Sequence, residues 1–399
     1  MKKILAMLLA LVMVLGLVAC GTDAPETTAP AETTAPAEST PAETNPAEST
    51  PAVSDVEYKI AMITDYGDIT DQSFNQTTYE AVKAFAEANG VAYNYYKPSG
   101  DSTAERIAMV DAAIVDGYNV IVMPGFAFGE TLAEVADLYP EIKFVALDVA
   151  EGEGGFTATE NVFSAVYQEE LSGYMAGYAA VKLGYKHLGY LGGMAVPAVQ
   201  RFGYGYLQGI DAAAKELGIV GDIKVEYVYG NQFYGDADIT AVMDTWYGEK
   251  GVECVFACGG GIWSSAAEAA AKVGGKVIGV DVDQAAIIDG QYGEGMTVTS
   301  AMKGLAPTVN TLLTAIILED NWAAYAGKIE TLGLVSADPE ANYVQLPTAT
   351  TQFEEGKFTE ADYAAMVKAM FEGTVVVSGD ISAFPTTEVA VETYADIKG

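Results

Sequence analysis

Short apolar segments alternate with longer segments of helical periodicity along most of this chain. In the first series the apolar segments predict strands, and apolar residues at helical spacing predict helices between them. The predicted strands are residues 59–64, 92–96, 120–124 and 143–147, and the predicted helices are residues 74–89, 102–116 and 128–139. Strands that alternate with helices in this way are typical of α/β proteins with parallel sheets.

A second series repeats the pattern further along the chain. Its predicted strands are residues 187–191, 224–229, 254–257 and 276–280, and its predicted helices are residues 161–183, 199–217, 239–250 and 263–272. Two such series predict two similar lobes, each a parallel sheet with right-handed crossovers. Facing strand ends would leave a cleft between the lobes, and hinge closure over a ligand is usual for this architecture.

The polar stretch 65–76, DYGDITDQSFNQ, lies between the first predicted strand and the first predicted helix. Loops at this edge of an open α/β sheet bind ligands. Tyr66, Asp71, Phe74 and Asn75 supply aromatic faces and directional polar groups together. Ser73 precedes Gln76 by three residues, which is the spacing of a capping box, so a capped surface turn is the alternative interpretation.

The N-terminus has the pattern of an export signal. Two lysines precede an apolar run at residues 4–18 that is too short for a permanent membrane span. The run ends Leu-Val-Ala-Cys-Gly, which resembles a bacterial lipobox and predicts Cys20 as the lipidated first residue after cleavage of a signal peptide at 1–20. A lipid chain would anchor the protein to a membrane face. An ordinary signal cleavage site with a chance cysteine is the alternative.

Residues 21–56 are rich in Pro, Thr, Ala and Glu and carry almost no residues that a core would bury. Such a segment does not offset its ordering entropy, and we expect a disordered tether between the anchor and the folded body. The remaining chain, from residue 57 to 399, is long enough for two domains.

Charge and cysteine content narrow the possible partners. The formal net charge is −35, and loss of Lys2 and Lys3 with the signal would bring it to −37. This charge argues against nucleic acid as a partner. Cys254 and Cys258 lie four residues apart in one predicted strand, about 13 Å from each other, which is too far for a disulfide. We expect both to be buried free thiols.

Several segments together resemble one known family. They are D-x-S-F-N-Q at 71–76, Leu-Asp at 147–148, GVDVDQ at 279–284 and TSAMK at 299–303. In this order and behind a lipobox, they resemble the basic membrane protein family, lipoproteins that serve ABC transporters as substrate-binding proteins and are similar to purine nucleoside receptors. The resemblance covers roughly residues 58–380. It implies a type I periplasmic-binding-protein fold with a three-segment hinge, lobe 1 holding residues 57–158 and 301–326 and lobe 2 holding residues 159–300 and 327–399.

The resemblance also implies a set of polar binding residues. Asn75 falls on the family's base-binding Asn, and an amide both donates and accepts hydrogen bonds. Asp148 ends a strand and would accept from a purine N–H, with an N-cap or turn role as the alternative. Asp281 would accept from ribose hydroxyls, while its neighbour Asp283 would cap the next turn; spacing alone does not separate the two. Lys303 follows a strand-like segment and would donate to a sugar oxygen, although a lone Lys is otherwise a solvated surface charge.

Aromatic residues near the expected cleft are the next candidates. The family stacks the base between rings, and Tyr66 and Phe233 lie near the expected positions, with Tyr234 as a rival to Phe233. The run of glycines around Gly260 allows close backbone approach at a helix start. Trp263 stands where the resemblance implies a smaller residue, and it would narrow or reshape the pocket.

Catalytic and metal sites find no support in the sequence. His187 is the only histidine, and it begins a predicted strand, as a structural residue would. The sequence assembles no Ser–His–acid set, histidine-based metal site or P-loop. We therefore expect no catalytic residues, no metal and no cofactor.

The sequence as a whole predicts a lipid-anchored, extracytoplasmic binding protein. We expect it to capture a small neutral solute, a purine nucleoside above all, and to deliver it as a monomer to an ABC permease. A sugar or autoinducer receptor of the same fold is the alternative within binding proteins. A lipoprotein enzyme acting on nucleosides is the alternative from another class.

Overall fold

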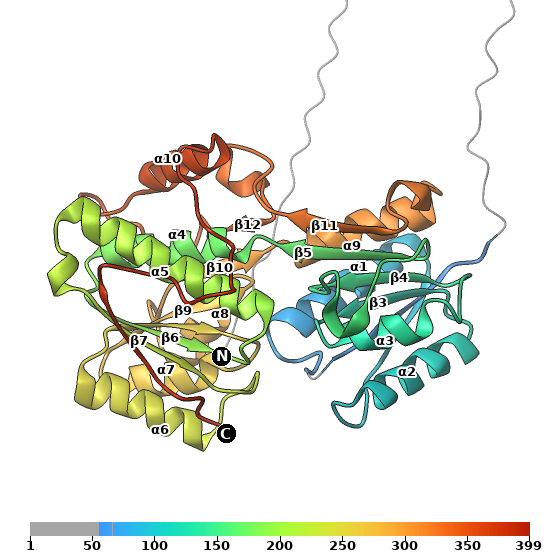
Figure 1. The fold of residues 1–399 in the computed structure, drawn as a ribbon, viewed down its shortest axis with the longest axis horizontal. Helices are drawn as coiled ribbons and strands as arrows, with labels where there is room; N and C mark the ends of the chain where they lie inside the picture. The colour runs from blue at the N-terminus through green and yellow to red at the C-terminus, as the bar shows by residue number, and fades with distance from the viewer. Residues whose placement is uncertain (1–55, 66) are drawn as a thin grey trace, which may run out of the picture. The chain divides into compact units, whose positions relative to one another are not determined.

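Two β-sheets organise the part of the chain that the computed structural model describes, residues 56–65 and 67–399 (Figure 1). The signal peptide, Cys20, the tether up to residue 55 and Tyr66 lie outside the described residues. The strands are β1 (Lys59–Ile63), β2 (Ala92–Tyr96), β3 (Val120–Pro124), β4 (Lys143–Leu147), β5 (Val162–Tyr167), β6 (His187–Gly192), β7 (Lys224–Tyr229), β8 (Cys254–Cys258), β9 (Lys276–Asp281), β10 (Thr297–Lys303), β11 (Lys328–Leu332), β12 (Val344–Gln345) and β13 (Ala390–Thr393).

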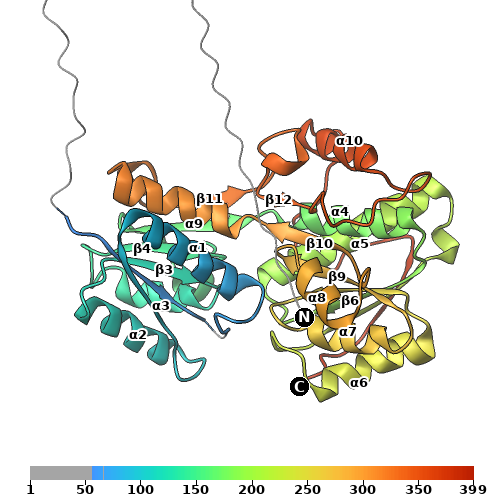
Figure 2. The same ribbon diagram turned by 180° about the vertical axis from the view of Figure 1, so that it is seen from behind.

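Helices connect most of these strands and cover both faces of each sheet (Figure 2). They are α1 (Phe74–Asn89), α2 (Thr103–Val115), α3 (Phe128–Val135), α4 (Glu169–Leu183), α5 (Pro197–Leu217), α6 (Ala237–Thr245), α7 (Trp263–Ala271), α8 (Ala285–Tyr292), α9 (Leu305–Leu313) and α10 (Glu360–Phe371). The boundaries predicted for β2, β3, β4 and α1 from hydrophobic pattern alone are confirmed.

The first sheet has six strands in the order β11-β5-β4-β3-β1-β2, and all its pairs are parallel. Helices α1 and α9 pack on one face, where Val82 and Leu305 belong to one apolar cluster. Helices α2 and α3 cover the other face through Val110 and Phe128. Because both faces are covered, strands such as β3 are buried along their whole length and read as continuous apolar runs.

The second sheet has seven strands in the order β12-β10-β9-β8-β6-β7-β13. Its pairs are parallel except β10 with the two-residue strand β12. Helices α4, α5 and α10 contribute to the apolar cluster on one face, and α6, α7 and α8 to the cluster on the other. Cys254 and Cys258 are buried in β8 as free thiols, which confirms the prediction.

The sequence-based prediction was wrong at residue 161. A helix was expected to begin there, but β5 (Val162–Tyr167) pairs with β4 and β11, and α4 begins only at Glu169. The segment VFSAVY suits a strand buried on both sides, and apolar periodicity does not distinguish such a strand from a buried helix.

The chain changes sheets three times, after β5, after β10 and between β11 and β12. The first sheet thus includes β5 and β11, which lie beyond the predicted ends of the lobe 1 segments at 158 and 326. Strand β10 belongs to the second sheet up to Lys303, beyond the boundary predicted at 300. The division of the whole chain into lobes stays a proposal, with these strands moved. None of the helices within residues 56–65 and 67–399 has the length and apolar character of a membrane span.

Candidate ligand-binding site

A cavity with about 670 Å³ of free space, part of it open to solvent, lies where the carboxyl ends of strands from both sheets meet. Residues that follow or end β1, β3 and β4 line it from the first sheet, and residues that end β8, β9 and β10 line it from the second. Among the residues predicted for the site, it is lined by Asp71, Phe74, Asn75, Asp148, Phe233, Gly260, Asp281 and Lys303. The structure therefore brings together eight residues that span more than half of the chain.

The start of α1 is capped differently from the prediction. Ser73 makes no side-chain capping bond, so the predicted capping box is wrong. Asp71 does this work instead, because its carboxylate accepts from the backbone N–H groups of Ser73, Asn75 and Gln76 at 2.9–3.0 Å. The Ser73 hydroxyl is thereby left to donate to Asp281 Oδ2, 2.6 Å away at the end of β9 in the other sheet.

The two polar atoms of the Asn75 amide differ in their hydrogen bonding. Its Nδ2 donates to Asp65 Oδ1 at 3.1 Å and to Asp71 Oδ2 at 3.2 Å. Its buried Oδ1 has no hydrogen-bond partner among the described residues. A buried acceptor without a partner costs free energy, so this oxygen is well placed to receive a donor from a ligand.

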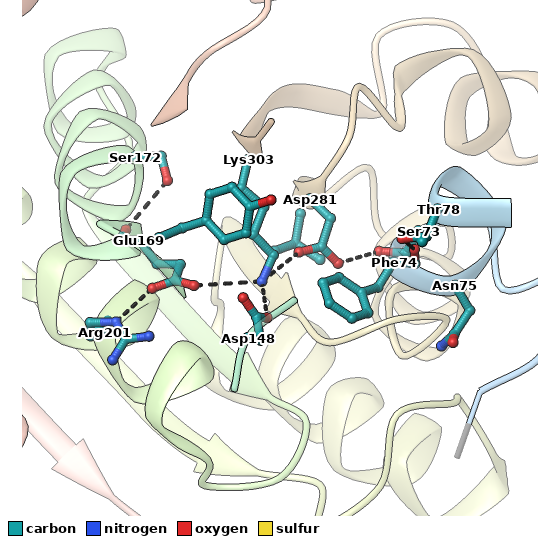
Figure 3. Close-up of polar contacts among 12 residues, drawn as sticks. Ser73, Phe74, Asn75, Thr78, Asp148, Glu169, Ser172, Arg201, Asp281 and Lys303 are labelled. Carbon is teal, nitrogen blue, oxygen red and sulfur yellow. Dashed lines mark hydrogen bonds and ion pairs between the residues drawn. The ribbon is translucent and has the colours of Figure 1, made fainter. Parts of the chain in front are cut away.

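Lys303 stands at the centre of three carboxylates (Figure 3). Its Nζ lies 2.5 Å from Asp148 Oδ2, 3.5 Å from Glu169 Oε1 and 3.7 Å from Asp281 Oδ1. The ammonium also lies over the Phe74 ring, 4.7 Å from its centroid. Lys303 is therefore a buried structural cation of the cavity and not a solvated surface charge.

Burial and neighbouring charges act in opposite directions on these groups. Burial raises the pKa of Asp148 to about 7, against the lowering effect of the Lys303 ammonium. Burial alone would lower the pKa of Lys303, but Asp148, Asp281 and Glu169 outweigh it and raise that pKa above its ordinary value. Lys303 is thus positively charged at every physiological pH.

Asp148 lines the cavity, and its two carboxylate oxygens have different surroundings. Oδ2 accepts from Lys303, whereas the buried Oδ1 has no hydrogen-bond partner among the described residues. Asp148 has φ 62° and Asp281 has φ 65°, the left-handed region that non-glycine residues seldom adopt. Such backbone strain is characteristic of functional sites, and here it turns both carboxylates into the cavity at the ends of β4 and β9.

Glu169 and Arg201 extend the charged cluster and were not predicted. Arg201 Nε lies 2.6 Å from Glu169 Oε2, and the Glu169 side chain is fully buried at the first turn of α4. Phe202, the neighbour of Arg201 on α5, lines the cavity with its ring 5.6 Å from Lys303 Nζ. No local pattern marked these residues as different from other positions of their helices. The remaining unpredicted lining residues are Asp65, Gly67, Gly125, Phe126, Val196, Ala198, Val199, Cys258, Gly259 and Val280.

On the second-lobe side of the cavity, the sequence left two choices between neighbouring residues. Phe233 lines the cavity, whereas Tyr234 is 63% exposed and does not. Asp281 lines the cavity, whereas Asp283 accepts from the backbone N–H of Ala285 at the start of α8. The spacing in the sequence had left both choices open, and the geometry favours Phe233 and Asp281.

Trp263 does not reach the cavity, and the suggestion that it narrows the pocket is wrong. Its side chain is buried in the helix layer over the outer face of the second sheet and meets the Tyr292 ring edge-on. At this helix start only the backbone of Gly259 and Gly260 reaches the cavity, with φ values of 154° and 52°.

His187 lies away from the cavity. It begins β6, and its Nε2 lies 2.9 Å from Oε1 of Glu226 on β7, so this contact links the two strands. Within the described residues, no group of three or more His, Cys, Asp or Glu side chains is arranged to hold a metal ion.

Two parallel-sheet lobes, three connections and a cavity at facing strand ends define a solute-binding protein of the type I periplasmic fold. Residues 58–351 match the family described as ABC transporter substrate-binding protein PnrA-like, and the chain belongs to this family. This confirms the resemblance seen in the sequence.

Similar proteins agree with this assignment. The chain is 29% identical to the ABC transporter nucleoside-binding protein BmpA of Lactococcus lactis over 57% of this chain and 65% of that protein, slightly less than two thirds of its length. It is 27% identical to basic membrane protein B of Borreliella afzelii over 69% of this chain and 78% of that protein. A solved solute-binding protein of an ABC transporter system from Aeropyrum pernix matches with a TM-score of 0.62 and 25% identity, over 80% of this chain and 87% of the other.

Proposed function

We propose that this protein captures a purine nucleoside outside the cytoplasm and delivers it to an ABC permease. The observation that carries the proposal is the pairing of unpartnered acceptors with aromatic faces in one cavity. Asn75 Oδ1 and Asp148 Oδ1 are buried acceptors without partners among the described residues. Phe74, Phe202 and Phe233 line the same space. A purine offers N–H donors at its edge and a flat face for stacking, so it satisfies both features.

The charge of the cavity favours a ligand without phosphate. Four carboxylates line it, those of Asp65, Asp71, Asp148 and Asp281. The lining also includes Lys303, whose ammonium is already paired with Asp148 and Asp281. A phosphate would face these carboxylates at short range in a partly dry cavity, where like charges repel strongly. Ribose hydroxyls would instead donate to Asp281, as the resemblance implies, and accept from Lys303. The relative from Lactococcus lactis, named as nucleoside-binding, agrees with this choice.

Competition among four ligands tests the proposal. Calorimetry should show adenosine and guanosine binding the unmodified protein more tightly than ribose or a hexose. Tighter binding of ribose or the hexose than of both nucleosides would favour the sugar-receptor alternative and leave the fold assignment intact. The corresponding nucleoside monophosphates should bind more weakly than the nucleosides, because only they place charge beside the carboxylates.

Binding without turnover separates a receptor from an enzyme. Nucleosides incubated with the pure protein should be recovered unchanged, while the melting temperature rises with ligand concentration. Release of free base in proportion to protein concentration would instead establish the enzymatic alternative.

The proposal includes a lipid anchor on Cys20. The anchor and the tether would hold a monomeric body at the extracytoplasmic face of the membrane. Cys20 lies outside the described residues, and the sequence pattern alone supports its role. Cys20→Ala should release the protein from membranes without changing the dissociation constant for nucleosides. Membrane retention at the level of the unmodified protein would refute the lipid anchor.

A further inference from the structure

The last residues of the chain form a strap that runs across the second lobe, and we define this C-terminal strap as residues 378–399. It lies beyond residues 58–351, which match the family. Figure 1 shows it in dark red, passing from α10 along α5 toward α6. Its contacts lead step by step to the loop that carries Phe233.

The strap is first fixed to the outer face of α5. Gln208 and Ser378 exchange two hydrogen bonds of 2.9 Å, one from Gln208 Nε2 to the Ser378 carbonyl and one from the Ser378 N–H to Gln208 Oε1. Asp211 Oδ1 accepts from the backbone N–H groups of Glu388 at 2.7 Å and Val389 at 3.0 Å. These bonds hold two separate points of the strap against one helix.

The strap then extends the second sheet. Strand β13 pairs in parallel with β7, which would otherwise be the edge strand. Just beyond it, the Tyr394 hydroxyl contacts the buried carboxylate of Glu226 on β7. The backbone N–H of Tyr394 donates to the Tyr227 carbonyl at 3.0 Å, and that of Ile397 donates to the Tyr229 carbonyl at 2.9 Å. The strap thus follows β7 to its carboxyl end, the end that faces the cavity.

The final contacts are made with the loop of residues 230–236, which we call the Phe233 loop. Asn231 Nδ2 donates to the Lys398 carbonyl at 2.9 Å, and Lys398 Nζ lies 2.8 Å from Asp236 Oδ2. Asp236 Oδ1 also caps α6 by accepting from the backbone N–H groups of Asp238 and Ile239, each at 3.0 Å. Lys398 therefore holds both ends of the loop, one through its carbonyl and the other through its ammonium.

Contacts outside the strap also hold the Phe233 loop. The N–H groups of Gly230 and Asn231 donate to the carbonyls of Gly192 and Gly193 at 2.7 and 2.9 Å. The Gly261 N–H donates to the Phe233 carbonyl at 2.8 Å, which fixes the middle of the loop. A Cβ on Gly193 would lie 2.5 Å from the Phe233 ring, so the ring packs directly on bare backbone. Asn231 has φ 60°, a conformation that the loop holds more easily when its side chain is bonded. The ring is packed closely, and the strap adds contacts with the side chains of Asn231 and Asp236 near the two ends of the loop.

We propose that the C-terminal strap is a positioning element for the ligand site, acting through Lys398 on the Phe233 loop. Phe233 touches the ligand space, and the strap does not line it. The strap restricts the conformations of the loop before the ligand binds. Binding then costs less conformational entropy, so the affinity is higher. This inference rests on the proposed function for its choice of ligand, but the ordering of the loop itself does not.

Two variants and a matched control test the proposal. A chain that ends at Thr393 keeps β13 but loses Lys398 and with it the contacts between the strap and the Phe233 loop. Lys398→Ala removes only the ammonium. Lys368→Ala is the control, because it removes the same charge from an exposed site on α10, where Lys368 Nζ lies 3.8 Å from Glu372 Oε1. Should the shortened chain fail to fold, Lys398→Ala still provides the test.

The first measurement is amide hydrogen exchange of residues 230–236 without ligand. Exchange should be at least several-fold faster in both strap variants and unchanged in Lys368→Ala. The second is calorimetry with adenosine and guanosine, where the chain ending at Thr393 should bind about fivefold to tenfold more weakly. This is the expected effect of removing one hydrogen bond and one partly exposed ion pair from the loop. In a Phe233→Ala background the same shortening should change affinity less than twofold.

Unchanged exchange in the loop would overturn the proposal, as would an equal loss of affinity with and without Phe233, which indicates a general structural role. If the unmodified protein binds neither nucleoside, the proposed function fails, but the exchange measurement still decides whether the strap orders the loop.

Discussion

The sharpest test of the site is the substitution Asp148→Asn, because the two carboxylate oxygens of Asp148 have different surroundings. Oδ2 accepts from Lys303 at 2.5 Å, and Oδ1 is buried without a partner among the described residues. In the variant the amide oxygen keeps the bond to Lys303, which places the NH2 group where Oδ1 stood. A purine N–H would then meet a donor instead of an acceptor. Asn also tolerates the φ of 62° at this position.

The expected loss is that of one charge-assisted hydrogen bond, about 1.5–3 kcal/mol, or about a tenfold to hundredfold weaker affinity for the nucleosides. Stability of the unliganded protein should change little. Asp148 is one of three carboxylates around a single ammonium, and burial raises its pKa to about 7, so removing its charge relieves repulsion while it weakens the bond to Lys303. We expect the melting temperature to stay within about 2 °C, since 1 kcal/mol shifts it by roughly 1–2 °C in a body of this size.

The assay pairs calorimetry on adenosine and guanosine with thermal unfolding of the unliganded protein. Asp137→Asn, the same change at an exposed position of the first lobe, serves as the control. Affinity within twofold of the unmodified protein would show that Asp148 does not contact the ligand. A large drop in melting temperature together with weaker binding would show that Asp148 acts through the fold.

Three further outcomes follow from the structure. Lys303→Met should destabilise the protein by about 3–5 kcal/mol, because it leaves buried carboxylates without their cation, and adding Asp148→Asn should restore part of the melting temperature. Ser73→Ala removes the 2.6 Å bond to Asp281 between the two sheets, so nucleosides should bind about fivefold more weakly, and small-angle scattering of the unliganded variant should show a larger radius of gyration. Burial raises the pKa of Glu170 to about 7, so the folded form binds its proton more tightly than the unfolded form, and stability should fall as pH rises from about 4.5 to 7. Thermal unfolding across this range should show a flatter profile for Glu170→Gln, and an unchanged slope would contradict the assignment.

The alternation of strands and helices was readable from the sequence because it is a local property. Strands β2, β3 and β4 and helix α1 match their predicted bounds. In β3 and β4 the reason is an apolar run bounded by polar or turn-forming residues. The short strands β11, β12 and β13 were missed, and β11 and β13 are partly exposed edge strands without a strong apolar pattern. Their place is decided by pairing with β5 and β7, which is a tertiary contact.

Contacts within the site depend on pairs far apart in the chain. Lys303 meets Asp148 across 155 positions, and Ser73 meets Asp281 across 208. Local spacing indicated which residues end strands at the cavity, and the resemblance to a family indicated which of them to select. Neither indicated that the Ser73 hydroxyl leaves its own helix start to bond the opposite lobe, because Asp71 takes over the cap.

The error at residue 161 explains why Glu169 was missed. With a helix running from 161 to 183, Glu169 would lie in its third turn, where a Glu is an ordinary solvated residue. With β5 ending at Tyr167, Glu169 becomes the first residue of α4, directly after a strand end that faces the cavity. A carboxylate at that position is stabilised by the helix N-terminus and reaches both Lys303 and Arg201. Because β5 was predicted as helix, there was no reason in the sequence to select Glu169, the residue that links Lys303 to Arg201.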